Sequence, residues 1–337
     1  MSASAPSMYS PAARAVAEKL GLKMGRANLE VFADTLLEMA REDPSVVAVT
    51  SDSRGSGKLG PFAQTLPAQL VEVGIAEQNL VGIAAGLASC GKKVFAVSPA
   101  CFLTARALEQ IKNDVAYSGH PVTLVGISAG VSYGALGTTH HSLHDFAALR
   151  AINNLTIVAP ADNFETRAAV CAAAASGKPV YLRFGKAPLY DLPTLVDSTP
   201  FAPGRTRLLR AGTDVAFLAT GETVIHALLA AAHLEETSGI ACRVLSVPSI
   251  KPLDEKVILA CASLCRAVVT VEEHMVNGGL GEACAGLIAQ AGIRTRFKIA
   301  GIPDEYTVTG SQADIFRHYG LTMEGLAHTA FELIQSA

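Results

Sequence analysis

Residues 71–89 read VEVGIAEQNLVGIAAGLAS, and this stretch decides the fold of the chain. Val71 and Val73 are β-branched residues typical of a strand, and Gly74 marks a turn. From Ile75 onward, small apolar residues recur at helical spacing. The stretch therefore predicts a strand that passes through a tight turn into a helix.

Glu77 lies in the first turn of that predicted helix. No charged residue follows it from Gln78 to Gly91, so we expect the helix to be buried and Glu77 with it. A carboxylate in this place can complement the helix dipole or accept hydrogen bonds from free amides. A buried carboxylate with a partner or a raised pKa is also a candidate functional group, and the residues alone leave both readings open.

Strands and helices alternate along most of the chain, which predicts an α/β protein with two doubly wound domains. Prolines 188, 193, 200 and 203 interrupt the alternation and mark a linker. We therefore expect a first domain at 1–190, a linker at 191–210 and a second domain at 211–337. The predicted strands are 45–50, 71–74, 93–98, 121–128, 156–159, 179–185, 214–220, 241–247, 267–273 and 295–300. The predicted helices are 28–41, the one after residue 74, 102–117, 162–175, 222–236, 253–264, 280–292 and a helical tail from residue 311.

Composition narrows the class of protein. The 337 residues are 50% hydrophobic and carry a formal net charge of −3, without a lysine or arginine cluster that indicates nucleic acid. Seven scattered cysteines contain no C-x-x-C pair and are typical of a reducing compartment. The first residues have no signal-peptide pattern, and no apolar run reaches the length of a membrane span. We therefore expect a cytoplasmic protein that binds neither nucleic acid nor membrane.

The segment Gly74-Ile75-Ala76-Glu77-Gln78 resembles the signature of the transketolase family, and the resemblance extends from about residue 28 to the end. It implies a thiamine diphosphate-binding (pyrimidine) domain followed by a transketolase C-terminal domain. In this family the glutamate hydrogen-bonds N1′ of the cofactor's aminopyrimidine and so favours the imino tautomer of the 4′-amino group. The resemblance thus implies a catalytic role for Glu77 and a place for Gly74 and Ile75 in the cofactor site.

Phe102 follows a predicted strand, where an aromatic residue most often belongs to the core. The segment Arg106-Ala107-Leu108-Glu109-Gln110-Ile111 also matches the family and fixes the register. In that register, the resemblance implies that Phe102 stacks on the aminopyrimidine ring.

Three histidines occur in the segment Thr138-Thr139-His140-His141-Ser142-Leu143-His144-Asp145, after a glycine-rich loop. Metal ligands, structural histidines and a substrate contact are all compatible with this pattern, although a metal site has only Asp145 as a nearby carboxylate. The resemblance implies that His140 contacts the sugar substrate as a catalytic residue, and that His144 and Asp145 cap the next helix. We expect no metal site in this chain.

Arg54, Arg183 and Lys186 lie at or just beyond the ends of predicted strands. Each alone is an ordinary solvated charge, but together they are candidates for binding a substrate phosphate. The segment Arg183-Phe184-Gly185-Lys186 resembles the family's basic segment, with a lysine where the family has its phosphate-binding arginine. The lysine keeps the charge but loses the bidentate geometry.

Two further residues depart from the family pattern. Ser128 stands where transketolases have a histidine, and Leu136 where they have an aspartate that contacts the donor sugar. An apolar side chain cannot make that hydrogen bond. We therefore expect a sugar other than xylulose 5-phosphate or a different mode of binding, and the sequence leaves the donor and the acceptor open.

The family holds the cofactor's diphosphate through Mg²⁺ at a Gly-Asp-Gly segment, which does not occur in these 337 residues. The resemblance therefore implies the C-terminal subunit of a split transketolase, which transfers a two-carbon ketol unit between sugar phosphates. A separate N-terminal subunit would hold Mg²⁺ and the diphosphate, in an assembly of two copies of each chain. The alternatives are the β subunit of a 2-oxo acid dehydrogenase and a non-catalytic binding protein on the same scaffold. The identity of the partner and the role of residues 1–27 stay open.

Overall fold

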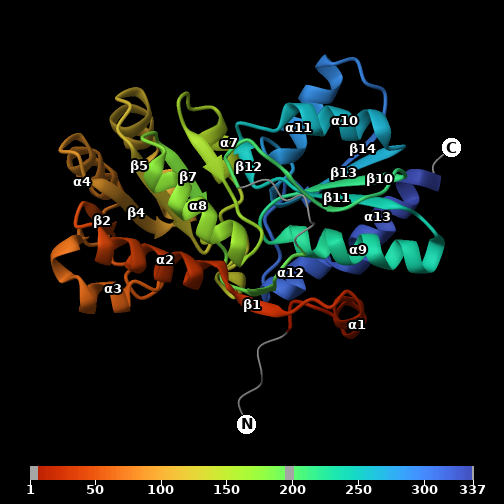
Figure 1. Ribbon diagram of the computed structural model, residues 1–337, viewed down its shortest axis with the longest axis horizontal. Coiled ribbons are helices and arrows are strands. Elements are labelled where there is room, and N and C mark those ends of the chain that lie inside the picture. Colours follow the sequence, from red (N-terminus) through yellow and green to blue (C-terminus); the bar gives the residue numbers. More distant parts are fainter. Residues whose placement is uncertain (1–6, 194–200, 336–337) are drawn as a thin grey trace, which may run out of the picture.

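The computed structural model describes residues 7–193 and 201–335, which form two α/β lobes side by side (Figure 1). Within these residues, the first lobe has a sheet with the strand order β12-β6-β7-β5-β4-β2-β3. All neighbouring strands in it are parallel except β12, which is antiparallel to β6. The strands are β2 (Val46–Thr50), β3 (Leu70–Glu72), β4 (Lys93–Pro99), β5 (Val122–Ile127), β6 (Thr156–Val158), β7 (Val180–Arg183) and β12 (Ser249–Lys251).

Helices cover both faces of this sheet, as the prediction of a doubly wound domain requires. On one face α2 (Asn28–Glu42) packs against α8 (Asn163–Ala175), and both contribute to one apolar cluster with the sheet. On the other face, α4 (Glu77–Ser89), the segment 111–117 and α7 (Asp145–Arg150) contribute to a second cluster. Short helical segments lie between the larger elements: α3 (Gly60–Thr65), η1 (Pro67–Gln69) and η3 (Gly134–Leu136).

The single helix predicted over 102–117 is wrong. The structure has α5 (Ala100–Arg106), a short α6 (Leu108–Gln110) and a π-helical segment (Ile111–Tyr117). The helical path breaks at Ala107, whose φ of −104° lies outside the helical range. Arg106 is therefore the last residue of α5, and π-helical segments of this kind are frequent at functional sites.

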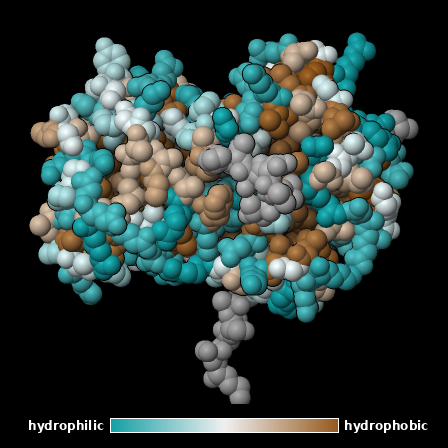
Figure 2. All heavy atoms as spheres, viewed as in Figure 1, coloured by the Kyte–Doolittle hydropathy of each residue, from teal (hydrophilic) through white to brown (hydrophobic). Residues whose placement is uncertain are grey.

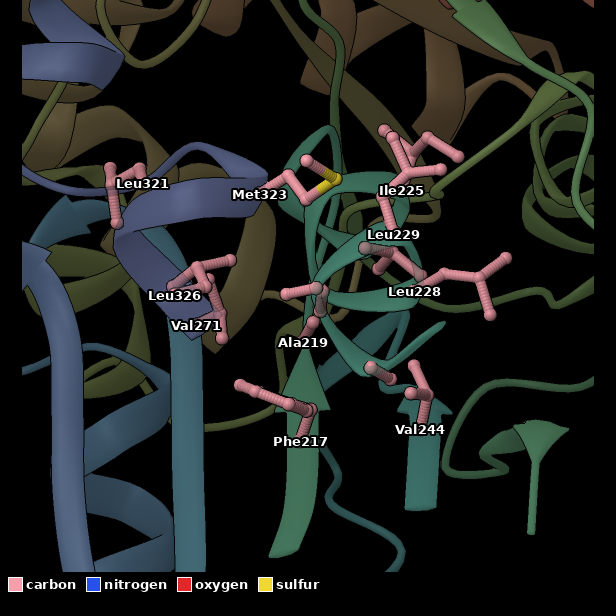
Figure 3. Close-up of a cluster of buried hydrophobic side chains, with 14 of the residues drawn as sticks. Phe217, Ala219, Ile225, Leu228, Leu229, Val244, Val271, Leu321, Met323 and Leu326 are labelled. Atoms are coloured by element: carbon pink, nitrogen blue, oxygen red, sulfur yellow. The ribbon is translucent and has the colours of Figure 1, made fainter. Parts of the chain in front are cut away.

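The second lobe repeats the α/β plan with the strand order β14-β13-β10-β11-β9 among the described residues. Its strands are β9 (Arg207–Arg210), β10 (Val215–Ala219), β11 (Cys242–Ser246), β13 (Ala267–Met275) and β14 (Arg296–Ile302). Its helices are α9 (Thr223–Ser238), α10 (Glu255–Leu264), α11 (Leu280–Gln290), α12 (Gln312–His318) and α13 (Met323–Gln335). Figure 3 shows part of its core, where Phe217 and Ala219 of β10 face side chains of α9 and α13.

Several elements connect the two lobes, and the sequence did not predict the strands among them. The strand β12 follows the second lobe's β11 in the sequence, yet it completes the first lobe's sheet. The helix α1 (Pro11–Lys19) packs on α9 of the second lobe, and β1 (Met24–Ala27) pairs with β8 (Pro188–Tyr190). One apolar cluster also continues from α4 to α10 and α11. Figure 2 nevertheless shows an indentation between the lobes at the top of the view.

The predicted linker 191–210 lies partly outside the described residues, because its central part, 194–200, is not described. Its last four residues form β9, which pairs with β11 in the second sheet. The domain boundaries at 190 and 211 stay predictions. No helix in the described part of the chain is both long and apolar enough to span a membrane.

Candidate active site

The candidate site lies where parallel strands of the first lobe reach their carboxyl ends. The residues that follow β2, β3, β4, β5 and β7 all lie at this edge of the sheet. Open α/β sheets bind their ligands at this edge, because the connecting loops converge there. All the predicted site residues follow one of these strands, apart from Arg183, which ends β7.

Glu77 is the first residue of α4 and is buried, with only 4% of its surface exposed. Gly74, with a φ of +73°, makes the turn that leads into the helix, a conformation that favours glycine. Nη1 of Arg106 donates to both carboxylate oxygens of Glu77 at 3.1 Å. The structure records no backbone amide that donates to this carboxylate in the described residues, so an ordinary capping role does not explain it.

Phe102 lies beside Glu77, on the helix that carries Arg106. The ring is half-buried, and the guanidinium carbon of Arg106 lies 4.3 Å from its centroid. The ring of His140 approaches the same phenyl ring edge-on, with 5.3 Å between the centroids. The structure thus brings Glu77, Phe102 and His140 together from three separate segments of the sequence. Ile75, on the turn before α4, is 75% exposed and leaves an apolar side chain at the rim.

The loop that carries His140 is held in place by the neighbouring His141. The ring of His141 is buried, with Nδ1 2.6 Å from Oγ1 of Thr307 and Nε2 2.9 Å from the carbonyl oxygen of Gly134. Burial lowers its pKa, so the ring is held neutral in a structural role. His140 itself is half-exposed, and its Nδ1 lies 3.0 Å from Oγ1 of Thr139. The second lobe, which contains Thr307, therefore helps to present His140.

His144 and Asp145 begin the next helix as predicted, but the prediction that their side chains cap it is wrong. His144 occupies the N-cap position of α7 without a side-chain capping bond, and its Nε2 lies 3.2 Å from Oγ1 of Thr104. Asp145 is fully buried, and Oδ2 accepts hydrogen bonds from the hydroxyl of Tyr181 and from Arg183. Its role is to neutralise a buried arginine.

Arg183 is not placed to bind phosphate, which corrects the prediction from the sequence. Its exposed fraction is 6%, and Nε donates to Asp145 at 2.8 Å. Nη2 donates to the carbonyl oxygens of Ser142 and Glu273, at 3.2 and 2.7 Å. The guanidinium also packs on the ring of Phe146. Two of these hydrogen bonds stay within the first lobe, and the one to Glu273 reaches the second lobe, so the guanidinium serves a buried structural contact.

Tyr133 is a site residue that the sequence analysis missed. Its ring lies 5.5 Å from that of His140, and Nζ of Lys186 lies 3.9 Å from the ring centroid. Burial lowers the pKa of Lys186, and the neighbouring charge of Lys58 adds to the effect. Two cations that repel each other favour an anion between them. A tyrosine in a glycine-rich loop gave no periodic signal by which it could have been found.

The remaining predicted residues border the same region. Arg54 is exposed after β2, and the structure records no ion pair for it in the described part of the chain. Leu136 is 55% exposed in the loop that carries His140, so its apolar side chain faces solvent. Ser128 is buried with a φ of +53°, and its hydroxyl has no hydrogen-bond partner in the described residues.

A cluster of buried carboxyl groups lies next to Arg183, between the lobes. Nε2 of Gln312 donates to both Glu222 and Glu273, at 2.9 Å each, and Glu273 also accepts from the amide of Val131 in the first lobe. Burial raises the pKa of Glu222 to about 8, with the charge of Glu273 adding to the effect, and burial raises the pKa of Glu273 to about 7. Ionisation of these carboxyl groups therefore destabilises the packing between the two lobes.

This cluster makes stability depend on pH. Because the pKa of Glu222 is raised above its ordinary value of 4.5, its stabilising contribution is complete at acidic pH and is lost as pH rises toward 8. The unfolding free energy of the wild type should fall between about pH 6 and about pH 8.5. That of Glu222→Gln, which stays neutral at this position, should fall by about 1–3 kcal/mol less. Urea denaturation of both proteins at the two pH values measures this. Equal pH dependence of the two proteins would show that Glu222 ionises normally in the folded chain.

The described residues contain no group of three or more His, Cys, Asp or Glu side chains able to hold a metal ion. Their site has instead a buried carboxylate, a half-buried aromatic ring and a histidine at one edge of a parallel sheet. This donor set fits a flat heteroaromatic ring with a nitrogen that hydrogen-bonds a carboxyl group. Together with the second α/β lobe, this arrangement is what the resemblance to the transketolase family predicts for a pyrimidine-binding domain.

Family models confirm this class. The pyrimidine-binding domain of transketolase matches residues 25–190, and the transketolase C-terminal domain matches residues 204–326. The chain belongs to the transketolase family, as the C-terminal subunit of a split, thiamine diphosphate-dependent transketolase.

Individual relatives agree with this assignment. An apulose-4-phosphate transketolase subunit of Phocaeicola vulgatus is 49% identical over 304 residues, which cover 90% of this chain and 96% of that protein. A putative transketolase C-terminal section of Methanocaldococcus jannaschii is 35% identical over 89% of this chain and 94% of its own length. A solved split-gene transketolase, described as an inactive β4 tetramer, superimposes with a TM-score of 0.80 at 34% identity, over 92% of this chain and 98% of that one.

Proposed function

We propose that this chain supplies the aminopyrimidine half of an active site that is completed by a separate subunit. The observation that carries the proposal is the approach of Glu77, Phe102 and His140 at one edge of the first sheet. The cofactor, when bound, supplies the nucleophilic carbon for ketol transfer. Activity of the chain with and without a diphosphate-binding partner tests the proposal.

Each residue has a distinct task in this proposal. Glu77 holds and exchanges a proton at N1′ of the aminopyrimidine, and its burial keeps water from competing for that proton. Phe102 stacks on the ring, while Gly74 and Ile75 form the turn at its side. His140, half-exposed at the edge of Phe102, hydrogen-bonds or exchanges a proton with the sugar substrate.

The substrate phosphate is assigned to Lys186 and Arg54, without Arg183. Lys186 is half-buried beside Tyr133 and close to the charge of Lys58, and Arg54 is exposed. We propose a sugar phosphate of the kind named for the 49% identical relative, apulose 4-phosphate. The apolar Leu136, at a position where an aspartate would contact a more conventional donor sugar, supports this choice.

The partner is an N-terminal transketolase subunit that holds Mg²⁺ and the diphosphate. The absence of Gly-Asp-Gly from this chain supports a shared cofactor, because nothing else in the sequence matches the family's diphosphate site. We propose two copies of each chain in the assembly, and the tetramer named for the solved split-gene relative supports self-association. We also propose a cytoplasmic location, because the scattered cysteines of the sequence contain no C-x-x-C pair and are typical of a reducing compartment.

The helix α4 is the proposed surface for assembly, and two of its glycines test it. A Cβ added at Gly82 or Gly86 meets no atom within 4 Å, so both positions face open space in this chain. We expect Gly86→Leu to leave the chain folded and to weaken its assembly by about 1–3 kcal/mol, because the leucine overpacks the contact with another chain. Light scattering across a dilution series, alone and with the partner, measures this effect.

Two controls make the result specific to the contact. Gly86→Ala adds a single methyl group at the same position, so its effect on assembly should be smaller. Thermal unfolding of each variant shows that the chain itself is intact. Unchanged assembly of both Gly82→Leu and Gly86→Leu, or a strictly monomeric wild-type chain, would remove this surface from the proposal.

Of the two alternatives, the 2-oxo acid dehydrogenase subunit is not favoured by the relatives, which are named as transketolase subunits. A non-catalytic scaffold would have no need for a buried carboxylate beside an aromatic ring. Ketol-transfer activity in the presence of a diphosphate-binding subunit separates it from the enzyme.

A further inference from the structure

Arg106 contacts both Glu77 and Phe102. It lies four residues after Phe102 on α5, so both side chains point to the same face of the helix. Its guanidinium packs on the Phe102 ring at 4.3 Å and donates to both oxygens of Glu77 at 3.1 Å. One flat, cationic group thus satisfies both of the side chains that define the site.

A guanidinium resembles an aminopyrimidine in the features that these side chains recognise. Both groups are planar, both carry nitrogen atoms that hydrogen-bond a carboxyl group, and both stack on aromatic rings. Glu77 is buried, and a buried carboxylate without a partner is costly, so some group must neutralise it when the aminopyrimidine does not. Arg106 is the residue that does so in this structure.

We propose that Arg106 closes the aminopyrimidine half-site from within the chain, and that the cofactor must displace its side chain in order to bind. The inference rests on the proposed function, since it takes Glu77 and Phe102 as the cofactor's contacts. The side chain of Arg106 is 50% exposed, so it can swing into solvent without unfolding α5. Binding of the cofactor and pairing of Arg106 with Glu77 are therefore competing events.

The expected size of the competition follows from the kind of contact. A half-exposed ion pair and a cation–π contact at the surface are each modest, and together they reduce the apparent affinity of a competing ligand roughly tenfold. Arg106 and the cofactor compete for Glu77 at the binding step, before any chemistry. The measured affinity for the cofactor therefore reports this competition directly.

The test is calorimetric titration of thiamine diphosphate, in the presence of Mg²⁺, into the complex of this chain with its diphosphate-binding partner. Arg106→Met keeps an apolar stem over Phe102 but removes the charge and the donors, so it should bind the cofactor roughly tenfold more tightly than the wild type. Arg106→Lys keeps the charge without the planar group, so its affinity for the cofactor should lie between those of the wild type and Arg106→Met. In a Glu77→Gln background, the gain from Arg106→Met should shrink, because the two groups act on each other.

A matched control removes the same charge elsewhere. Arg167 is 53% exposed and pairs with Glu38 on the α2–α8 face, so Arg167→Met should leave the affinity unchanged. If Arg106→Met and Arg106→Lys bind with wild-type or weaker affinity while Glu77→Gln and Phe102→Ala weaken binding, the closing role is wrong and the half-site stands. If Glu77→Gln and Phe102→Ala leave binding unchanged, the proposed half-site itself is wrong.

Discussion

Glu77→Gln should lower the turnover of the reconstituted enzyme by about two to four decades, the usual contribution of a positioned proton-transfer group. Glutamine has nearly the same shape as glutamate and still accepts a hydrogen bond from Arg106, but it has no proton to exchange with the cofactor. Because Glu77 is buried, water does not readily replace its function. Turnover and the exchange rate of the cofactor's C2 proton, followed by NMR, measure the loss.

The same amide-for-acid change at an exposed position serves as the control. Glu109 lies on α6 of the same lobe and is exposed, so Glu109→Gln should leave both rates unchanged. The Glu77→Gln chain should fold and assemble with wild-type stability to within about 1 kcal/mol. Exchange of the C2 proton at the wild-type rate in Glu77→Gln would show that Glu77 is only a structural carboxylate.

The sequence predicted those parts of the fold that produce a local pattern. The charge-free run after Glu77 correctly indicated that Glu77 is buried, and the alternation of apolar segments indicated two α/β lobes. The expectation that the whole helix is buried was wrong, because α4 buries only one face and leaves Gln78, Asn79 and Gly86 exposed. The short strands β1, β8 and β12 were missed because each has only three or four residues, too few for a period to appear. Their pairing also joins segments far apart in the sequence, which local pattern does not encode.

The errors at the site have a similar cause. Arg183 ends a strand whose four residues are all buried, and the sequence does not show that its side chain runs to Asp145 and the second lobe rather than to a ligand. Tyr133 lies in an irregular loop and was missed for lack of any period. Arg106 helped to fix the register of Phe102, but its contact with Glu77 depends on where α5 ends, which the predicted continuous helix concealed.

Two observations support the proposal that the chain carries half of a cofactor site. The first lobe brings a carboxylate, an aromatic ring and a histidine to one edge of its sheet, where we propose that they contact one end of the cofactor. The sequence has no Gly-Asp-Gly segment for the other end. We therefore propose that catalysis needs a second subunit, which holds the other end of the cofactor.

The most direct test is a ketol-transfer assay of the purified chain in thiamine diphosphate and Mg²⁺, with and without a purified subunit that carries Gly-Asp-Gly. The chain alone should show no turnover above background and only weak cofactor binding, and activity should appear on addition of the partner. Mass spectrometry of the preparation confirms that no partner has co-purified. Robust, cofactor-dependent ketol transfer by the chain alone would contradict the half-site.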